Sequence, residues 1–365
     1  MTHHIPHVPG QSLMKENPMY IEYFDDVYNS LQSASVVVGG DVNKYFKING
    51  FTIRLKFCGQ GLIPYIMPAL EHLACRQASE SDLTICLWDS TTTRTKIPAI
   101  PWKINDQAIP GEIWRYDDET LMIVYHPSNN TIILLNKARN LGIYWTGDAA
   151  AIPYYDQASP LRLIFQRWMR TRQCQVVHAG AVGFPHGGIL LVGKGGSGKS
   201  TTTLNCLNSE LLYVSDDFCL INDHPHPHVY SLYNTGKLDA HDIDRFPSLK
   251  PALSDQGDLN DEKALYFFYR CFPDKISAGF PVKAIFIPEV TGLFDTKLKK
   301  VSPAKGFLAM APTTIFMIPK AEQQDANRYL DRFVRKVPNY ILELGTDLGQ
   351  IPRVIINFLK SGKNE

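Results

Sequence analysis

The chain has 365 residues, of which 44% are hydrophobic and 20% charged, and its formal net charge is +1. This length favours two domains over one, and the composition is that of a globular protein able to bury a substantial core. The near-zero charge argues against nucleic acid or an anionic membrane surface as a partner.

The seven cysteines include no C-x-x-C pair. An odd number without that spacing argues against a disulfide framework and against a structural zinc site. The first residues, Met-Thr-His-His-Ile-Pro-His, show no basic segment followed by an apolar core. No apolar run approaches the ~20 residues that span a bilayer. We therefore expect a cytoplasmic protein without a membrane partner.

Alternating apolar and polar residues predict strands in the first part of the chain. Residues 45–57 contain two such stretches joined by Asn49-Gly50, a pair that accepts the positive φ angles of a type I′ turn, so a hairpin is predicted. A second hairpin is predicted over 121–135, across a Pro-Ser-Asn-Asn turn. One helix is expected near 65–75. This part of the chain is therefore predicted to be β-rich.

The pattern changes after residue 158. Ser159 is predicted to cap a helix that has Pro160 in its first turn, and apolar residues with interspersed arginines follow at helical spacing. We expect this helix to pack on the next sheet with its arginines in solvent. Strands then alternate with helices, which indicates an α/β layer structure. The sequence thus predicts a β-rich N-terminal domain over 1–158 and an α/β domain over 159–365. The further strands expected in the second domain are 174–182, 189–192, 211–214 and 340–344, with a closing helix over 351–359.

The strongest motif begins at Gly193, where the chain reads Gly-Lys-Gly-Gly-Ser-Gly-Lys-Ser and fits G-x-x-x-x-G-K-[ST] in full. The glycines allow successive N–H groups to turn inward, and the helix that starts near Lys199 adds its own unpaired N–H groups. Lys199 is placed to neutralise the β- and γ-phosphates, and the Ser200 hydroxyl to bind Mg²⁺. The sequence therefore predicts a site for ATP and Mg²⁺. The residues expected to contact the nucleotide are Gly193, Lys194, Gly195, Gly196, Ser197, Gly198, Lys199, Ser200 and Thr201.

An apolar stretch further along ends in Asp216 and Asp217. Two adjacent carboxylates near a triphosphate allow one to attend a metal while the other takes a proton. The alternative is that these acids form a turn or cap after a strand. His178, in the stretch Val-Val-His-Ala-Gly-Ala-Val, is either a satisfied core histidine or a member of the same site.

His178, the loop 193–201 and the pair Asp216-Asp217 occur in the order and spacing of the HPr kinase/phosphorylase family, which the segment 161–221 resembles. It looks most like the HPr-kinase-related serine kinases associated with peptide modification, some of which act on precursor peptides such as those of lasso peptides. The resemblance implies an α/β P-loop kinase core of the HPr kinase and phosphoenolpyruvate carboxykinase type in the second domain.

The resemblance also implies a role for each site residue. Asp217 corresponds to the general base that takes the proton of a serine hydroxyl, and Lys199 acts on the transferring phosphoryl group. Asp216 and Ser200 attend the magnesium, and His178 contributes hydrogen bonding and charge balance. We therefore expect catalytic roles for Asp217, His178 and Lys199.

Two features of the family lack a counterpart in this chain. The family carries a metal-binding glutamate after the acidic pair, where this chain offers only Lys237 and Asp239, and no arginine-bearing substrate loop is recognisable near 302–306. The β-rich first domain also differs from the regulatory domain of HPr kinases, and we expect it to take part in substrate recognition.

The function expected from the sequence is an ATP-dependent kinase that transfers the γ-phosphoryl group to a serine-type hydroxyl on a peptide or protein. Two alternatives stay open: a kinase for a sugar or amino acid, and a non-catalytic, nucleotide-gated binding protein. A homo-oligomer is compatible with the sequence.

Overall fold

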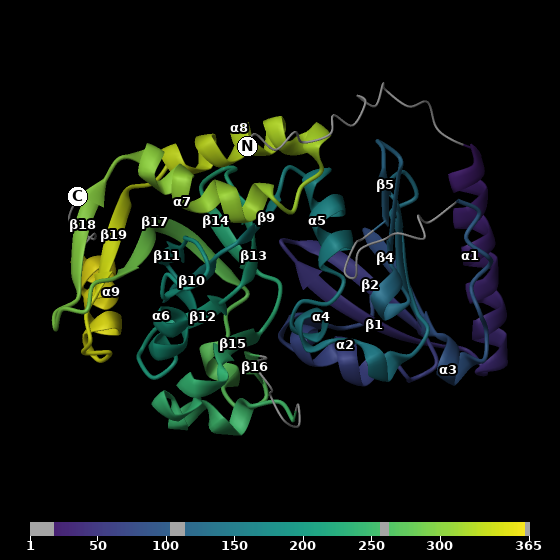
Figure 1. Ribbon diagram of the computed structural model, residues 1–365, viewed down its shortest axis with the longest axis horizontal. Helices are drawn as coiled ribbons and strands as arrows, with labels where there is room; N and C mark the ends of the chain where they lie inside the picture. Colours follow the sequence, from purple (N-terminus) through teal and green to yellow (C-terminus); the bar gives the residue numbers. More distant parts are fainter. Residues whose placement is uncertain (1–17, 103–113, 256–262, 362–365) are drawn as a thin grey trace, which may run out of the picture.

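The computed structural model describes residues 18–102, 114–255 and 263–361. The first part of the chain forms an eight-stranded sheet and the second part a nine-stranded one, and helix α5 lies between them (Figure 1). The mixed α/β class is confirmed. The boundary between 158 and 159 stays a prediction, and the N-terminal residues considered for a signal peptide lie outside the described ranges.

The first sheet has the order β3-β1-β2-β4-β8-β7-β6-β5. The predicted hairpin over 45–57 is confirmed: Asn49 and Gly50 have φ angles of 48° and 80° between antiparallel β1 and β2. The hairpin over 121–135 is confirmed as β6 and β7. The strands are β1 (Asp41–Ile48), β2 (Phe51–Cys58), β3 (Ala74–Cys75), β4 (Leu83–Asp89), β5 (Trp114–Asp117), β6 (Leu121–His126), β7 (Thr131–Asn136) and β8 (Leu141–Thr146).

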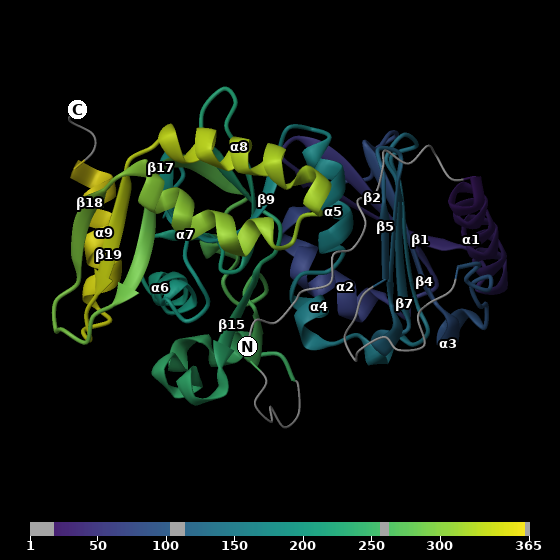
Figure 2. The same ribbon diagram turned by 45° about the horizontal axis from the view of Figure 1, so that its top comes forward.

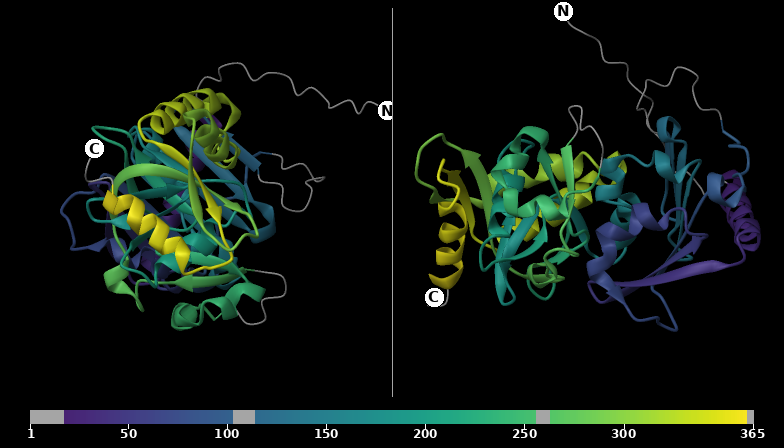
Figure 3. Two further views of the ribbon diagram at one scale, coloured as in Figure 1. Left: turned by 90° about the vertical axis from the view of Figure 1, so that its left-hand side faces the viewer. Right: turned by 90° about the horizontal axis from the view of Figure 1, so that it is seen from below.

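Helices cover both faces of this sheet. On one face lies α1 (Pro18–Val37), for which we made no prediction and which Figure 3 (right) shows along the outer side of the sheet. On the other face lie α2 (Ile63–Leu70), near the helix expected at 65–75, and α5. The short α3 (Ser90–Thr93) follows β4. The face toward α5 joins side chains of both sheets in one apolar core, so the two halves of the chain are packed together through α5.

The predicted start of the helix after residue 158 is wrong. Ser159 instead ends α4 (Tyr154–Ala158), where its hydroxyl donates to the Tyr155 carbonyl at 3.2 Å. The helix α5 (Arg162–Arg170) begins after Leu161, whose φ of 59° turns the chain. The predicted helix is therefore present as α5, but it begins three residues after Ser159, and the separate short helix α4 precedes it.

The expectation that the α5 arginines are solvated is wrong for Arg167, which is 2% exposed. Its guanidinium forms ion pairs with Asp117 of β5 at 2.6 Å and with Glu322 at 3.2 Å. Charges are buried in proteins only when paired, and here the partners come from segments far apart in the sequence.

The second sheet has β17 at its centre and the order β12-β10-β11-β17-β14-β13-β9, with β19 paired to both β17 and β18. The predicted single strand over 174–182 is wrong, because the chain leaves β13 at Ala179 and continues beside β11 and β12. There the Ala179 N–H donates to the Asp217 carbonyl at 2.9 Å, and the Ala179 carbonyl accepts from the Ser215 hydroxyl at 3.1 Å. The strands are β9 (Gln175–His178), β10 (Gly180–Phe184), β11 (Gly187–Leu191), β12 (Leu212–Ser215), β13 (Phe218–Asn222), β14 (His228–Ser231), β17 (Gly279–Val290), β18 (Lys297–Val301) and β19 (Asn339–Leu344).

Helices also cover both faces of the second sheet. The pair α7 (Pro303–Ile315) and α8 (Gln323–Arg335) run side by side over one face (Figure 2), and α6 (Lys199–Cys206) and α9 (Gln350–Ser361) pack on the other. A separate ribbon of β15 (Thr235–Asp239) and β16 (Lys263–Phe267) lies next to α6. The expected strands at 189–192, 211–214 and 340–344 and the closing helix are confirmed within a few residues. None of the helices in the described ranges is long and apolar enough to cross a membrane.

Candidate functional site

The glycine-rich loop lies between β11 and α6, so a buried strand feeds directly into the loop and then into a helix N-terminus. Gly196 and Gly198 have φ angles of 73° and 100°, which residues with a Cβ rarely adopt. At Gly198 an added Cβ would also lie 2.4 Å from a methyl carbon of Leu344. Backbone geometry and close packing therefore both require glycine at the start of α6.

Lys199 is folded back onto this loop. Its ammonium donates to the carbonyls of Gly193 at 2.7 Å and Lys194 at 3.1 Å, and the residue is 6% exposed. Burial lowers its pKa, although the nearby charges of Asp216 and Asp217 act in the opposite direction.

The loop also contains a polar atom suited to a ligand. The Ser197 hydroxyl is buried, and no other described residue forms a hydrogen bond with it. Buried hydroxyls are nearly always hydrogen-bonded, and a phosphate oxygen would satisfy this one. The residues present therefore fit a polyphosphate.

Asp216 lies behind the loop and is 2% exposed. One of its carboxylate oxygens accepts from the Thr203 hydroxyl at 2.7 Å and the other from the Lys237 backbone N–H at 3.1 Å. Burial and then the charge of Asp217 raise the pKa of Asp216. The nearby Ser200 hydroxyl acts to lower the pKa of Asp216. A carboxylate next to a hydroxyl offers the hard oxygen ligands that Mg²⁺ prefers, and a bound cation would favour the ionised acid.

Asp217 is held between two nitrogen donors. His178 Nε2 lies 2.8 Å from one oxygen and Lys237 Nζ lies 2.5 Å from the other. Burial alone would raise the pKa of Asp217, but the charge of Lys237 and the hydrogen bond from His178 outweigh it and hold the pKa well below its usual value. His178 was interpreted either as a satisfied core histidine or as a member of the same site. Its contact with Asp217 places it beside the acidic pair and not in a purely apolar core.

The sequence did not identify two residues, Lys237 and Thr203, as members of this cluster. Lys237 was considered only for the metal-ligand position, and the structure pairs it with Asp217. Thr203 lies one helical turn beyond Ser200, and this i, i+3 spacing on a predicted helix could have identified it. Asp239, the other weak candidate, lies on the exposed end of β15, 3.5 Å from Lys263.

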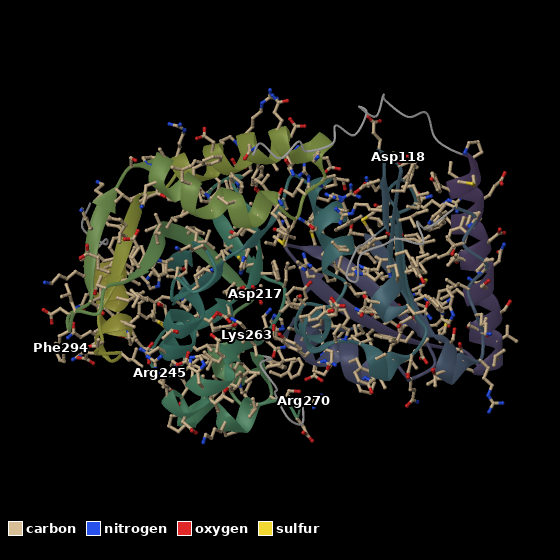
Figure 4. The ribbon with its side chains drawn as sticks, in the orientation of Figure 1. Asp118, Asp217, Arg245, Lys263, Arg270 and Phe294 are labelled. Carbon is tan, nitrogen blue, oxygen red and sulfur yellow. The ribbon has the colours of Figure 1, made fainter. Side chains whose placement is uncertain are left out.

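The site lies where the two halves of the chain meet. Figure 4 shows Asp217 near the middle of the molecule. The segment that leads to Lys237 is tied to the α4–α5 turn, since the Thr235 hydroxyl donates to the Ala158 carbonyl at 2.7 Å and the Tyr233 hydroxyl to the Pro160 carbonyl at 2.9 Å. These two hydrogen bonds connect the segment before Lys237 to the α4–α5 turn.

Comparisons with known proteins establish no family for the chain. No protein-family model matches it, and no curated protein matches it. Among solved structures it is similar to the Hpr(Ser) kinase/phosphatase from Coxiella burnetii, with 11% sequence identity over 52% of this chain and 99% of that chain and a TM-score of 0.30. A likeness of this size carries no argument about activity.

Proposed function

We propose that the chain is an ATP-dependent kinase that transfers the γ-phosphoryl group to a serine-type hydroxyl on a peptide or protein. The observation that carries the proposal is the placement of Asp217 between His178 and Lys237, beside a second carboxylate and a phosphate-type loop. A loop alone would bind phosphate. A carboxylate held ionised next to it is suited to receive the proton of an attacking hydroxyl.

The residues divide the work of phosphoryl transfer. The loop amides and the N-terminus of α6 bind the phosphates, and Lys199 neutralises charge on the transferring group. Ser200 and Asp216 would hold Mg²⁺, which neutralises the negative charge that develops on the phosphate oxygens. Transfer of this kind depends more on positioning and charge neutralisation than on covalent help from the protein.

The contacts with His178 and Lys237 make Asp217 weakly basic and thereby limit its role. A weakly basic carboxylate does not deprotonate a free hydroxyl. Asp217 instead accepts a hydrogen bond from the acceptor hydroxyl, and this bond directs a lone pair of the hydroxyl oxygen toward the phosphorus atom. The hydroxyl becomes strongly acidic only as its bond to phosphorus forms, and its proton then moves to Asp217. His178 and Lys237 keep the carboxylate in place and favour its return to the ionised form.

The proposal is tested with ATP labelled at its γ-phosphate, Mg²⁺, a mixture of serine-containing peptides and, separately, a set of sugars and amino acids. We expect label on peptide serine, and its loss in Lys199→Met. Label on a metabolite and on no peptide would overturn the peptide acceptor. ATP turnover without a labelled acceptor, with partner binding that depends on ATP, would instead favour a nucleotide-gated binding protein.

A further inference from the structure

A small pocket with both apolar and polar lining residues opens between the first sheet and the α4–α5 turn. It has a volume of about 40 Å³. At ~10–15 Å³ for each water-sized group, this is room for roughly three such groups. Its polar lining comes from β6–β8 on one side and from the turn on the other: His126, Thr131, Tyr144, Asp156, Ser159 and Arg162.

Two opposite charges in this pocket lack an ion-pair partner among the described residues. The Arg162 guanidinium lies 4.7 Å from the centre of the Phe218 ring and donates only to the Met317 sulfur, at 3.3 Å. The Asp156 carboxylate forms no hydrogen bond or ion pair within the described ranges, and burial raises its pKa to about 6. Oppositely charged side chains that lack partners in one pocket are typical of a site that binds a charged ligand.

The pocket is connected to the acidic pair. Phe218, on which Arg162 stacks, directly follows Asp217, and its ring centre lies 5.3 Å from that of His178. The charges of Asp156, Arg162 and Asp217 all act on the buried Tyr233 phenol. The contacts from Arg162 to Phe218, from Phe218 to His178 and from His178 to Asp217 therefore link this pocket to the proposed catalytic carboxylate.

We propose that this pocket binds the acceptor, with Arg162 holding a carboxylate close to the acceptor hydroxyl and Asp156 accepting a hydrogen bond from a neighbouring N–H. This inference rests on the proposed kinase function and names its acceptor chemistry. The planar guanidinium matches a carboxylate with two parallel hydrogen bonds, and an ionised aspartate only accepts them. The small volume and the negative charge of Asp156 disfavour a second phosphate in this place.

The carboxylate has two sources, the side chain of an acidic residue next to the serine or the α-carboxylate of the serine itself. Two pairs of synthetic peptides distinguish them: Ser-Glu against Ser-Gln within a peptide, and a peptide ending in serine as the free acid against its amide. For the wild-type chain we expect a lower KM for the carboxylate member of one pair, and that pair identifies the source.

Arg162→Gln is expected to raise the KM for the preferred peptide about ten- to a hundredfold, the usual effect of losing a charged hydrogen bond, and to abolish discrimination within the pair. The KM for ATP stays unchanged, and Arg162→Lys restores part of the preference. The matched control is Arg172→Gln, which removes an arginine that also stacks on an aromatic ring, 4.8 Å from the centre of Trp168, but does not line the pocket. This control keeps both KM values.

Equal KM values within both pairs for the wild-type chain would overturn the inference while leaving the kinase function intact. So would unchanged discrimination in Arg162→Gln. An absence of transfer to every peptide by the wild-type chain would instead overturn the kinase proposal, and the inference with it. The comparison of KM values within the two peptide pairs needs only the wild-type chain, so it tests the inference even when a variant fails to fold.

Discussion

Replacing Asp156 with asparagine should stabilise the protein at neutral pH. Asparagine keeps the shape of the side chain and removes a charge that has no ion-pair partner among the described residues. The pKa of this carboxyl rises from 3.8 to about 6 because it is buried, even though Arg162 and Lys237 act in the opposite direction. The folded protein therefore binds the proton more tightly than the unfolded chain does.

The sign and size of the effect follow from this difference. The stabilisation contributed by protonated Asp156 is fully present below the unfolded pKa of 3.8 and is lost as pH rises through the folded pKa of about 6. A shift of roughly two units corresponds to about 3 kcal/mol at ~1.4 kcal/mol per unit. We expect Asp156→Asn and wild type to be about equally stable near pH 4 and the variant to be about 3 kcal/mol more stable above pH 7.

The measurement is urea unfolding of both proteins across this pH range, with Asp325→Asn as a control at a carboxylate whose side chain is 74% exposed. A stability difference that does not change with pH would refute the reasoning, because it would show that the Asp156 charge is not destabilising in the folded state. The same variant should have a raised KM for the acceptor, so a stabilised protein with unchanged acceptor KM would remove Asp156 from the pocket proposal.

Two further changes test the packing around the site. Asp223→Asn should destabilise the protein by about 1.5–3 kcal/mol, since this buried carboxylate is ion-paired to the partly exposed Arg332 at 2.6 Å and Lys336 at 2.9 Å; a urea midpoint near that of wild type would contradict this. Gly180→Ala should cost about 1–3 kcal/mol, since the added Cβ would lie 2.5 Å from the Thr203 Cγ2 methyl. Thr203→Ser, which deletes that methyl and keeps the hydroxyl, should restore much of the loss, and a double variant no more stable than Gly180→Ala would show that the clash lies elsewhere.

Features encoded by adjacent residues were the ones predictable from the sequence. The hairpin at Asn49-Gly50 depends on two neighbouring φ angles, and the loop from Gly193 to Ser200 lies between a strand and a helix as the local pattern indicated. The roles of Asp217 as general base and of Lys199 at the transferring phosphoryl group remain predictions, although the structure brings both residues into one cluster.

Features that depend on distant partners were not predictable. Lys237 follows Asp217 by twenty residues, and only the return of the chain in β15 brings its ammonium to that carboxylate. Arg167 has the sequence pattern of a solvated helix face, but Asp117 and Glu322 bury it as an ion pair. The stretch 174–182 is mostly apolar and has no turn residue pair at its middle, so no local signal marked the change of partner strands at Ala179.

The central claim is that Asp217 receives the proton of the acceptor hydroxyl, and the most direct test is Asp217→Asn. The measurement compares the rate of γ-phosphoryl transfer from labelled ATP to the preferred peptide with the affinity for ATP in the same protein. We predict that transfer falls about 10²- to 10⁴-fold, the usual contribution of a positioned base, while ATP affinity is retained. Transfer at the wild-type rate with unchanged ATP affinity would show that Asp217 is not the base.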